Sequence, residues 1–309
     1  MQKRSILVAD DLENQTDSGK RRSQAIWKAA SFLAQRLKIG IDLLYVEDLK
    51  TYPLSKLGLY RFPAWHYAHQ KRLEETVKQC NRPVSCSLKN GSPAEQILKT
   101  LRSPSSAELV VVGTQGRTGV KRLLIGSVAE EVIRHSRRPV MVIGPLAQEV
   151  DLDLADQKKQ NILVPTDLGE NSRVAEHYAL SLARRIGAKV TLFHCMWDRI
   201  NSIIITAACS GMATFNMNEI FDESWNSALD SIKRKIGFFQ KHDVPCNYKI
   251  EEKAITSSFA IYRECVRNYS IVVMGTRGRN VLLNTFFGST ARETILNATI
   301  PVIIVHPGR

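Results

Sequence analysis

A glycine-containing motif occurs twice in this chain with the same internal spacing. Gly113-Thr-Gln-Gly116 is followed after nine residues by Gly126-Ser127, and Gly275-Thr-Arg-Gly278 is followed after nine residues by Gly288-Ser289. The two copies stand 162 residues apart and align without a gap. Each copy follows a short apolar run and precedes a segment with helical patterning. One such pattern arises easily by chance, but two in register predict a duplicated domain.

The duplication decides how the 309 residues are divided. A chain of this length suggests one large or two ordinary domains, and the repeat selects two of about 150 residues each. We expect a first domain over residues 1–147, a linker over 148–160 and a second domain over 161–309. The linker segment is charged and has no apolar period. Domains of this size bury enough surface to fold without disulfides or metals.

Apolar runs alternate with helical patterns in both halves, which is typical of β-α-β units and a mostly parallel sheet. We therefore expect an α/β fold of two tandem doubly wound domains, each a mostly parallel five-stranded sheet with helices on both faces. The expected strands are 5–9, 41–46, 84–88, 108–112 and 140–143, then 162–167, 190–195, 246–250, 271–274 and 301–305. The expected helices are 25–37, 66–80, one beginning near 92 and 128–135, then 172–186, 225–242, 257–268 and 290–296.

Parallel sheets of this kind bind ligands beyond the carboxyl ends of their strands, where the strand order reverses. Asp11 and Asp167 follow the first strand of each half, and the glycine motifs follow the fourth. If the first and fourth strands are neighbours, the aspartate and the glycines lie at the same edge of the sheet. Sequence alone does not prove that strand order.

The glycine motif has the chemistry of a phosphate-binding loop. Residues without a Cβ let backbone amides approach a phosphate closely, and the start of the next helix favours an anion. Arg117 and Arg279 occupy matching positions in the nine-residue runs, within reach of phosphates. The alternative is that the glycines end a strand and the serines cap a helix. The motif is neither a P-loop nor the dinucleotide fingerprint, whose glycine and lysine spacings it lacks.

The two motifs, the aspartate that ends the first strand and the order of strands and helices resemble the universal stress protein family over nearly all of both halves. The resemblance implies the adenine nucleotide alpha-hydrolase-like fold. Family members with this motif typically bind ATP, and some hydrolyse it slowly. The resemblance therefore implies an ATP-binding stress-response or regulatory protein, with the two domains packed as an intramolecular pair and dimerisation of the whole chain left open.

The resemblance also implies which residues contact the nucleotide. Adenine would lie between the ends of the first two strands, and the glycine motifs would contact ribose and phosphates. The implied first set is Ala9, Asp10, Asp11, Val46, Gly113, Gly116, Gly126, Ser127 and Val128, and the second is Pro165, Thr166, Asp167, Cys195, Gly275, Gly278, Gly288, Ser289 and Thr290.

The chain departs from the family pattern at several positions. The family often has a serine two residues after the aspartate, where this chain has Glu13 and Gly169. Gly91-Ser-Pro93 matches a family element before the third helix, but the aligned residues 253–255 do not. The first half also carries extra residues after Asp11, running through 16–21. These departures are consistent with degeneration of one site and do not identify which one.

Charge and composition narrow the partners. The net charge of +13 is spread over both halves, which favours nucleotides and phosphates in general and makes nucleic acid an unlikely partner. The six cysteines show no metal-ligand spacing, as in a reduced, cytoplasmic chain. The sequence shows no signal peptide and no apolar stretch of about 20 residues, so we expect no membrane segment.

No catalytic constellation stands out, so we expect no dedicated enzyme and at most a weak ATPase. Asp11 and Asp167 are candidate contacts for Mg²⁺ accompanying ATP; the alternative is that they cap strand ends. An apolar insert runs from Ile203 to Met217 and suggests a lid or a protein-binding surface. The second hypothesis is therefore a non-catalytic scaffold that binds a protein partner through this insert, with one or both nucleotide sites degenerate.

Overall fold

The computed structural model describes residues 4–12, 16–48, 84–102, 107–114, 124–148, 160–197, 200–201, 203, 205–206, 216–252, 256–276 and 287–306. The helix predicted over 66–80 lies outside these ranges. The chain forms two compact units, Met1–Ala155 with Gly308–Arg309, and Asp156–Pro307. The division between residues 155 and 156 falls inside the segment predicted as a linker.

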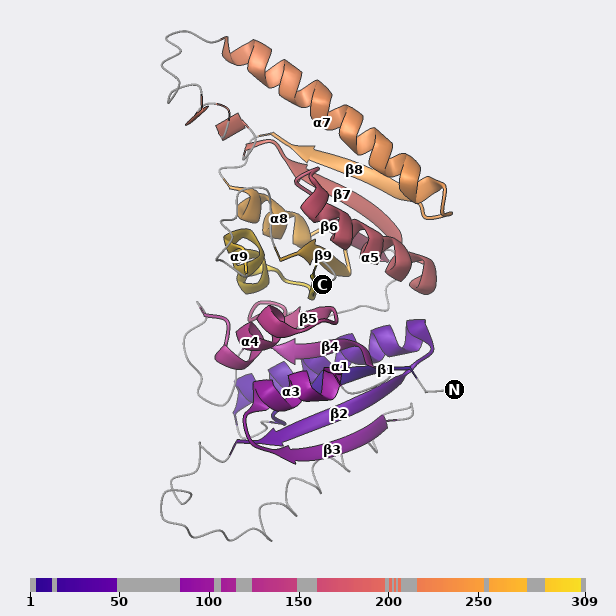
Figure 1. Cartoon of the computed structure of the whole chain (residues 1–309), viewed down its shortest axis with the longest axis vertical. Helices are drawn as coiled ribbons and strands as arrows, with labels where there is room; N and C mark the ends of the chain where they lie inside the picture. Colours follow the sequence, from indigo (N-terminus) through magenta and orange to yellow (C-terminus); the bar gives the residue numbers. More distant parts are fainter. Residues whose placement is uncertain are drawn as a thin grey trace. The chain divides into compact units, whose positions relative to one another are not determined.

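The first unit contains five described strands, all parallel, as predicted (Figure 1). Their spatial order is β3-β2-β1-β4-β5, so the chain moves in one direction from β1 to β3 and then returns to the other side of β1. The strands are β1 Ser5–Ala9, β2 Gly40–Glu47, β3 Val84–Asn90, β4 Ala107–Gly113 and β5 Val140–Ile143.

The second unit repeats this arrangement with five parallel strands in the order β8-β7-β6-β9-β10. The strands are β6 Asn161–Pro165, β7 Lys189–Cys195, β8 Cys246–Glu251, β9 Ile271–Gly275 and β10 Val302–Val305. Each unit is therefore a doubly wound sheet, and the fold class predicted from the sequence is confirmed.

Helices cover both faces of each sheet, because right-handed crossovers place those before and after the reversal on opposite sides. In the first unit α1 lies behind the strands and α3 in front (Figure 1). In the second unit α8 packs against α9, the helices that follow the reversal. The helices are α1 Asp17–Leu37, α3 Pro93–Arg102, α4 Ser127–His135, α5 Glu170–Ile186, α7 Met217–Gln240, α8 Ser257–Cys265 and α9 Ser289–Asn297.

Two helices begin eight residues before their predicted starts. The sequence predicted starts at residues 25 and 225, but α1 begins at Asp17 and α7 at Met217. The hydroxyl oxygen Oγ1 of Thr16 accepts a hydrogen bond from the Gly19 amide, and the side chain of Asn216 accepts one from the Asn218 amide. Capping of this kind starts a helix in a polar segment without apolar periodicity. The extra residues 16–21 are thus the first turn of α1.

The central strands carry almost continuous apolar runs because both faces of a parallel sheet are covered by helices. Ile6, Val8 and Val111 in the first unit and Val164 and Val273 in the second have no exposed surface. None of the helices in the described ranges is long and apolar enough to cross a membrane.

Two glycines provide a matched test of backbone conformation. Gly187 ends α5 with φ of 70°, whereas Gly237 lies within α7, and a Cβ at either position would meet no atom within 4 Å. Gly187→Ala should lower the free energy of unfolding by about 1 kcal/mol because an L residue is strained in the left-handed region. Gly237→Ala should raise it by about 0.5–1 kcal/mol through helix propensity. Urea unfolding of both variants measures the two signs, and equal signs would contradict this assignment.

Candidate functional site

The first and fourth strands are neighbours in both units, as the site hypothesis requires. In the first unit β1 pairs with β4, and Ala9 lies opposite Val112. In the second unit β6 pairs with β9, and Leu163 lies opposite Val272. Extending both registers places Asp10 opposite Gly113 and Thr166 opposite Gly275. The residues that end the first strand and those that begin the glycine motif therefore lie at the same edge of each sheet, where the strand order reverses.

Both units turn sharply after the first strand through a leucine in a left-handed conformation. Leu12 has φ of 51° and Leu168 has φ of 63°. The Leu12 amide donates to Oδ1 of Asp10 at 3.2 Å, and the Leu168 amide donates to Oγ1 of Thr166 at 3.0 Å. A branched residue with positive φ is costly, and such backbone is concentrated at functional sites. Its occurrence at equivalent positions marks this turn as a shared feature of the two units.

In the first unit, two neighbouring carboxylates have different partners. Asp10 is buried and accepts a hydrogen bond from the Ser23 hydroxyl at 2.5 Å. Burial raises the pKa of the Asp10 carboxyl to about 6. Asp11 is more exposed and forms an ion pair with the Arg22 guanidinium at 2.5 Å, although the Arg22 side chain is only 5% exposed. We call the buried Asp10 the inner carboxylate and Asp11 the outer one. The outer carboxylate is thus neutralised by a cation from α1.

The Arg22 stem also fills the space beside Gly113. A Cβ added at Gly113 would lie 3.0 Å from Cδ of Arg22 and 3.1 Å from Cδ1 of Ile26. The missing side chain at this position therefore lets α1 pack closely against the end of β4. The arginine stem and Ile26 thus fill the space that a side chain at this position would need, and the contact of Gly113 with ribose or phosphate stays a prediction.

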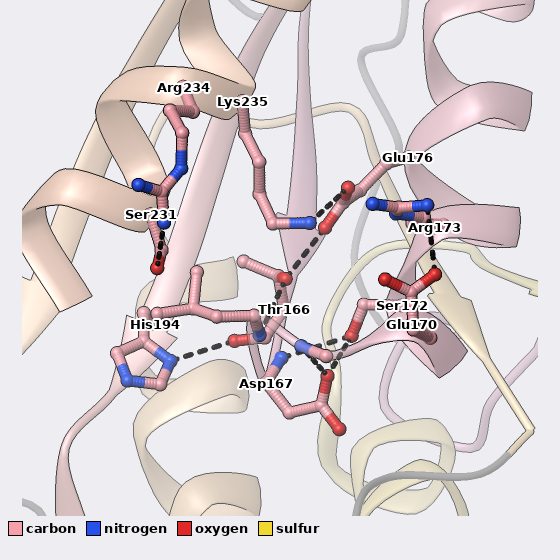
Figure 2. Close-up of polar contacts among 12 residues, drawn as sticks. Thr166, Asp167, Glu170, Ser172, Arg173, Glu176, His194, Ser231, Arg234 and Lys235 are labelled. Carbon is pink, nitrogen blue, oxygen red and sulfur yellow. Dashed lines mark hydrogen bonds and ion pairs between the residues drawn. The ribbon is translucent and has the colours of Figure 1, made fainter. Parts of the chain in front are cut away.

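In the second unit, the outer carboxylate belongs to Asp167 (Figure 2). Its Oδ1 accepts hydrogen bonds from the Gly169 amide at 2.9 Å and from the Ser172 hydroxyl, whose oxygen in turn accepts from the Asp167 amide at 3.0 Å. Its Oδ2 is buried and has no hydrogen-bond partner within the described ranges. Since buried carboxylate oxygens are normally paired, this atom points to a missing donor or cation.

The inner position of the second unit is Thr166, which is equivalent to Asp10 and belongs to a polar chain of four residues (Figure 2). The Thr166 hydroxyl donates to Oε1 of Glu176 at 2.7 Å, and Nζ of Lys235 pairs with Oε2 of Glu176 at 2.7 Å. Glu176 and Lys235 side chains are 5% and 15% exposed, so the pair is largely desolvated. On the other side, Nδ1 of His194 lies 2.9 Å from the Thr166 carbonyl oxygen. This chain links the end of β6 to α5, β7 and α7.

The third glycine of each motif, Gly126 or Gly288, holds the start of the following helix close to the end of the fourth strand. The Gly126 amide donates to the Thr114 carbonyl oxygen at 2.6 Å, and the Gly288 amide donates to that of Thr276 at 2.9 Å. A Cβ at Gly126 would lie 2.6 Å from the Thr114 oxygen, so no other residue fits there without a shift. Neither α4 nor α9 has a side-chain cap. Uncapped helix starts of this kind favour anions.

The remaining predicted contact residues flank this edge. Ser127 and Ser289 are exposed and begin α4 and α9, and the next residues, Val128 and Thr290, are half-buried. The other described members lie at the ends of the first, second and fourth strands: Ala9, Val46, Pro165, Cys195 and Gly275. Four predicted residues lie outside the described ranges: Gly116, Arg117, Gly278 and Arg279.

Sequence reasoning missed the side chains that α1 and α5 supply. Two serines occupy equivalent positions when the helices are aligned at their left-handed C-caps. Ser23 lies fifteen residues before Lys38, and Ser172 lies fifteen residues before Gly187. Both serines donate to a first-strand carboxylate, although Ser23 contacts the inner one and Ser172 the outer one. A helix-anchored alignment of the two halves is the signal that finds them, because the connecting turns differ in length.

Comparison with known proteins identifies relatives of both halves. A family model for the universal stress protein family matches residues 3–144 and 266–306. A universal stress protein of Mycobacterium tuberculosis is 24% identical over 294 residues, which cover 91% of this chain and 92% of the relative. A universal stress protein of Methanocaldococcus jannaschii is 27% identical over 126 residues, covering 38% of this chain and 71% of that protein.

Solved structures share the fold over the whole chain. The crystal structure of a universal stress protein from Archaeoglobus fulgidus has a TM-score of 0.64 at 18% identity, covering 99% of this chain and 97% of that one. A putative universal stress protein from Pseudomonas aeruginosa has a TM-score of 0.58 at 16% identity, with 99% and 94% covered. At these identities the likeness establishes the fold.

The Lys235–Glu176 pair should be costly to break from one side only. Lys235→Met leaves the buried Glu176 carboxylate without its cation and should lower the free energy of unfolding by about 3 kcal/mol. Adding Glu176→Gln removes the charge and keeps an acceptor for Thr166, so the double variant should regain most of that loss. Urea unfolding measures both. A double variant as unstable as Lys235→Met would contradict the charge argument.

The raised pKa of Asp10 predicts a stability change with pH. Below pH 4 the carboxyl is protonated in both the folded and unfolded chain, whose ordinary pKa is 3.8. Between pH 4 and 6 the carboxyl ionises in the unfolded chain but stays protonated in the folded one. The free energy of unfolding therefore falls by about 2–3 kcal/mol by pH 7. Asp10→Asn removes this loss, and its stability relative to the unmodified chain should rise by about that amount between pH 4 and 8. A pH-independent difference in urea unfolding would refute the assignment.

Proposed function

Because this chain belongs to the universal stress protein family, we propose that it is a nucleotide-responsive stress protein that binds ATP in both units. The observation that carries the proposal is the edge where the strand order reverses. There each unit places an aspartate, a left-handed turn and an uncapped helix start side by side, and this arrangement occurs twice in one chain.

The phosphates would lie at the starts of α4 and α9. The first-turn amides of these helices, together with the exposed hydroxyls of Ser127 and Ser289, supply donors, and the helix macrodipole adds positive potential. The base would lie toward the ends of the second strands, where Val46 and Cys195 offer backbone groups. Backbone recognition suits a base edge because it needs no particular side chain at these positions.

Mg²⁺ fits the second unit as a companion of ATP. When bound, it would neutralise phosphate charge and bridge phosphate to carboxylate. Asp167 is the residue that would hold it, through the buried Oδ2 that has no partner in the described part of the chain. No group of three or more histidine, cysteine, aspartate or glutamate residues within the described ranges could hold a metal ion. The other ligands would therefore be phosphate oxygens and water.

We propose binding with at most slow hydrolysis. A general base must be free to accept a proton from the attacking water. Asp10 is instead hydrogen-bonded to Ser23, Asp11 is paired with Arg22, and Asp167 would be engaged by Mg²⁺. The nucleotide would then act as a signal that the chain retains, and its cleavage would be a side reaction.

A second candidate function is protein binding through the segment 203–217, most of which lies outside the described residues. The observation that favours it is exposed apolar side chains before and within this segment. Trp197, which precedes the segment, is 39% exposed, and Ile205, which lies within it, is 55% exposed. Exposed apolar side chains that cluster often mark interaction sites.

A negative charge introduced at each helix start tests the ATP proposal. Aspartate at the first turn of a helix is favourable, so Ser127→Asp and Ser289→Asp should leave stability unchanged or raise it by about 0.3–1 kcal/mol. The same carboxylates would repel a triphosphate. Isothermal titration with Mg²⁺-ATP should show binding to the unmodified chain and its loss in the double variant.

The matched control is Ser127→Ala with Ser289→Ala, which keeps the helix-start amides without adding charge. This control should weaken binding by no more than about tenfold, the worth of one hydrogen bond per site. Full ATP affinity in the double aspartate variant would mean that the phosphates bind elsewhere. Absence of ATP binding to the unmodified chain would refute the function itself.

A further inference from the structure

We infer that the two units differ in their need for a divalent cation: Arg22 replaces the cation in the first unit, whereas Asp167 requires one in the second. The inference rests on the proposed function, since it concerns how each unit accommodates the same triphosphate. It follows from the charges that surround the outer carboxylate of each site, which the sequence repeat alone does not show.

The two outer carboxylates are equivalent in position. Asp11 and Asp167 are each the second residue after the last paired residue of the first strand, and each directly precedes the left-handed leucine. The helix that follows differs at one decisive place. Sixteen residues before the C-caps of α1 and α5, the first unit has Arg22 and the second has Asn171. The duplication therefore provides an internal comparison of a cationic and a neutral side chain.

In the first unit the cation is part of the protein. The Arg22 guanidinium contacts Oδ1 of Asp11 at 2.5 Å, and its stem is fixed between Gly113 and the rest of α1. A divalent cation at Asp11 would have to displace or lie beside this guanidinium. Like charges a few ångströms apart repel, so the guanidinium disfavours a second cation at Asp11. Arg22 therefore supplies beside Asp11 the positive charge that Mg²⁺ would otherwise bring to a bound triphosphate.

In the second unit the cation of the protein is elsewhere. Lys235 pairs with the inner carboxylate of Glu176, and the outer carboxylate of Asp167 keeps a buried oxygen without a partner among the described residues. Asn171 carries no charge that could neutralise Asp167. A triphosphate at the neighbouring helix start would meet this carboxylate as a second anion. A divalent cation that bridges the two relieves the repulsion and supplies the missing partner.

The difference does not come from the number of carboxylates. Each unit has one inner and one outer acid: Asp10 with Asp11, and Glu176 with Asp167. What changes is which acid the protein's own cation neutralises. In the first unit it is the outer acid next to the phosphate position, and in the second it is the inner acid, as Figure 2 shows for Lys235.

Variants with one added negative charge allow each site to be measured in the intact chain. Ser289→Asp blocks the second site and reports the first, and Ser127→Asp does the converse. ATP is titrated into each at pH 7.5, in Mg²⁺ and in EDTA, by isothermal titration calorimetry. Removal of Mg²⁺ should weaken binding at the first site by less than about threefold and at the second by about tenfold or more, as expected for an uncompensated carboxylate.

Exchanging the two helix residues should exchange the behaviour. Asn171→Arg in the Ser127→Asp background should make the second site tolerant of EDTA; because Asn171 is exposed, this variant should fold. Arg22→Asn in the Ser289→Asp background should make the first site Mg²⁺-dependent, whereas Arg22→Lys keeps the charge and should not. Circular dichroism checks that each variant is folded.

The outcomes separate this inference from the function. Three results would overturn the inference and leave ATP binding in place. They are equal Mg²⁺ dependence at the two sites, loss of ATP binding in EDTA at the first site but not at the second, and no effect of Asn171→Arg. No ATP binding in any background, with or without Mg²⁺, would overturn the proposed function. Unequal dependence that follows the exchanged residues would support the inference.

Discussion

The pairing of the first strand with the fourth is the constraint on which the candidate sites depend. Right-handed crossovers force the helices that enter and leave this pair onto opposite faces of the sheet. The candidate site of the first unit therefore lies at the carboxyl ends of β1 and β4, and that of the second unit lies at the carboxyl ends of β6 and β9. Within the residues that the structure describes, this edge brings an aspartate turn and a helix start together in each unit, which is why we propose that the ligand binds there.

The polar residues at this edge have diverged while the backbone has been kept. The left-handed leucine and the close glycine at the helix start recur in both units. Around them, the inner position is Asp10 in the first unit and Thr166 in the second, and the cation that pairs with an acid comes from α1 in the first unit and from α7 in the second. Two copies of one scaffold have thus acquired different electrostatics, which is how duplicated domains take on distinct binding requirements.

Sequence patterns predicted the strands and a mostly parallel sheet in each half, because apolar runs are local signals. They did not establish the order of the strands in the sheet. They did not predict where α1 begins, since Thr16 caps a polar turn without apolar periodicity. They also missed Arg22 and Lys235, whose partners are distant in the chain and appear only when helices pack. For the same reason, the glycine motif did not show that Arg22 and Ile26 fill the space beside Gly113.

The most direct test of the central claim is a crystal structure of the intact chain with a non-hydrolysable ATP analogue and Mg²⁺. The account predicts triphosphate density at the starts of α4 and α9, against Ser127 and Ser289, with the base toward the ends of β2 and β7. Density for the analogue away from both helix starts, in a crystal where both are open to solvent, would contradict it.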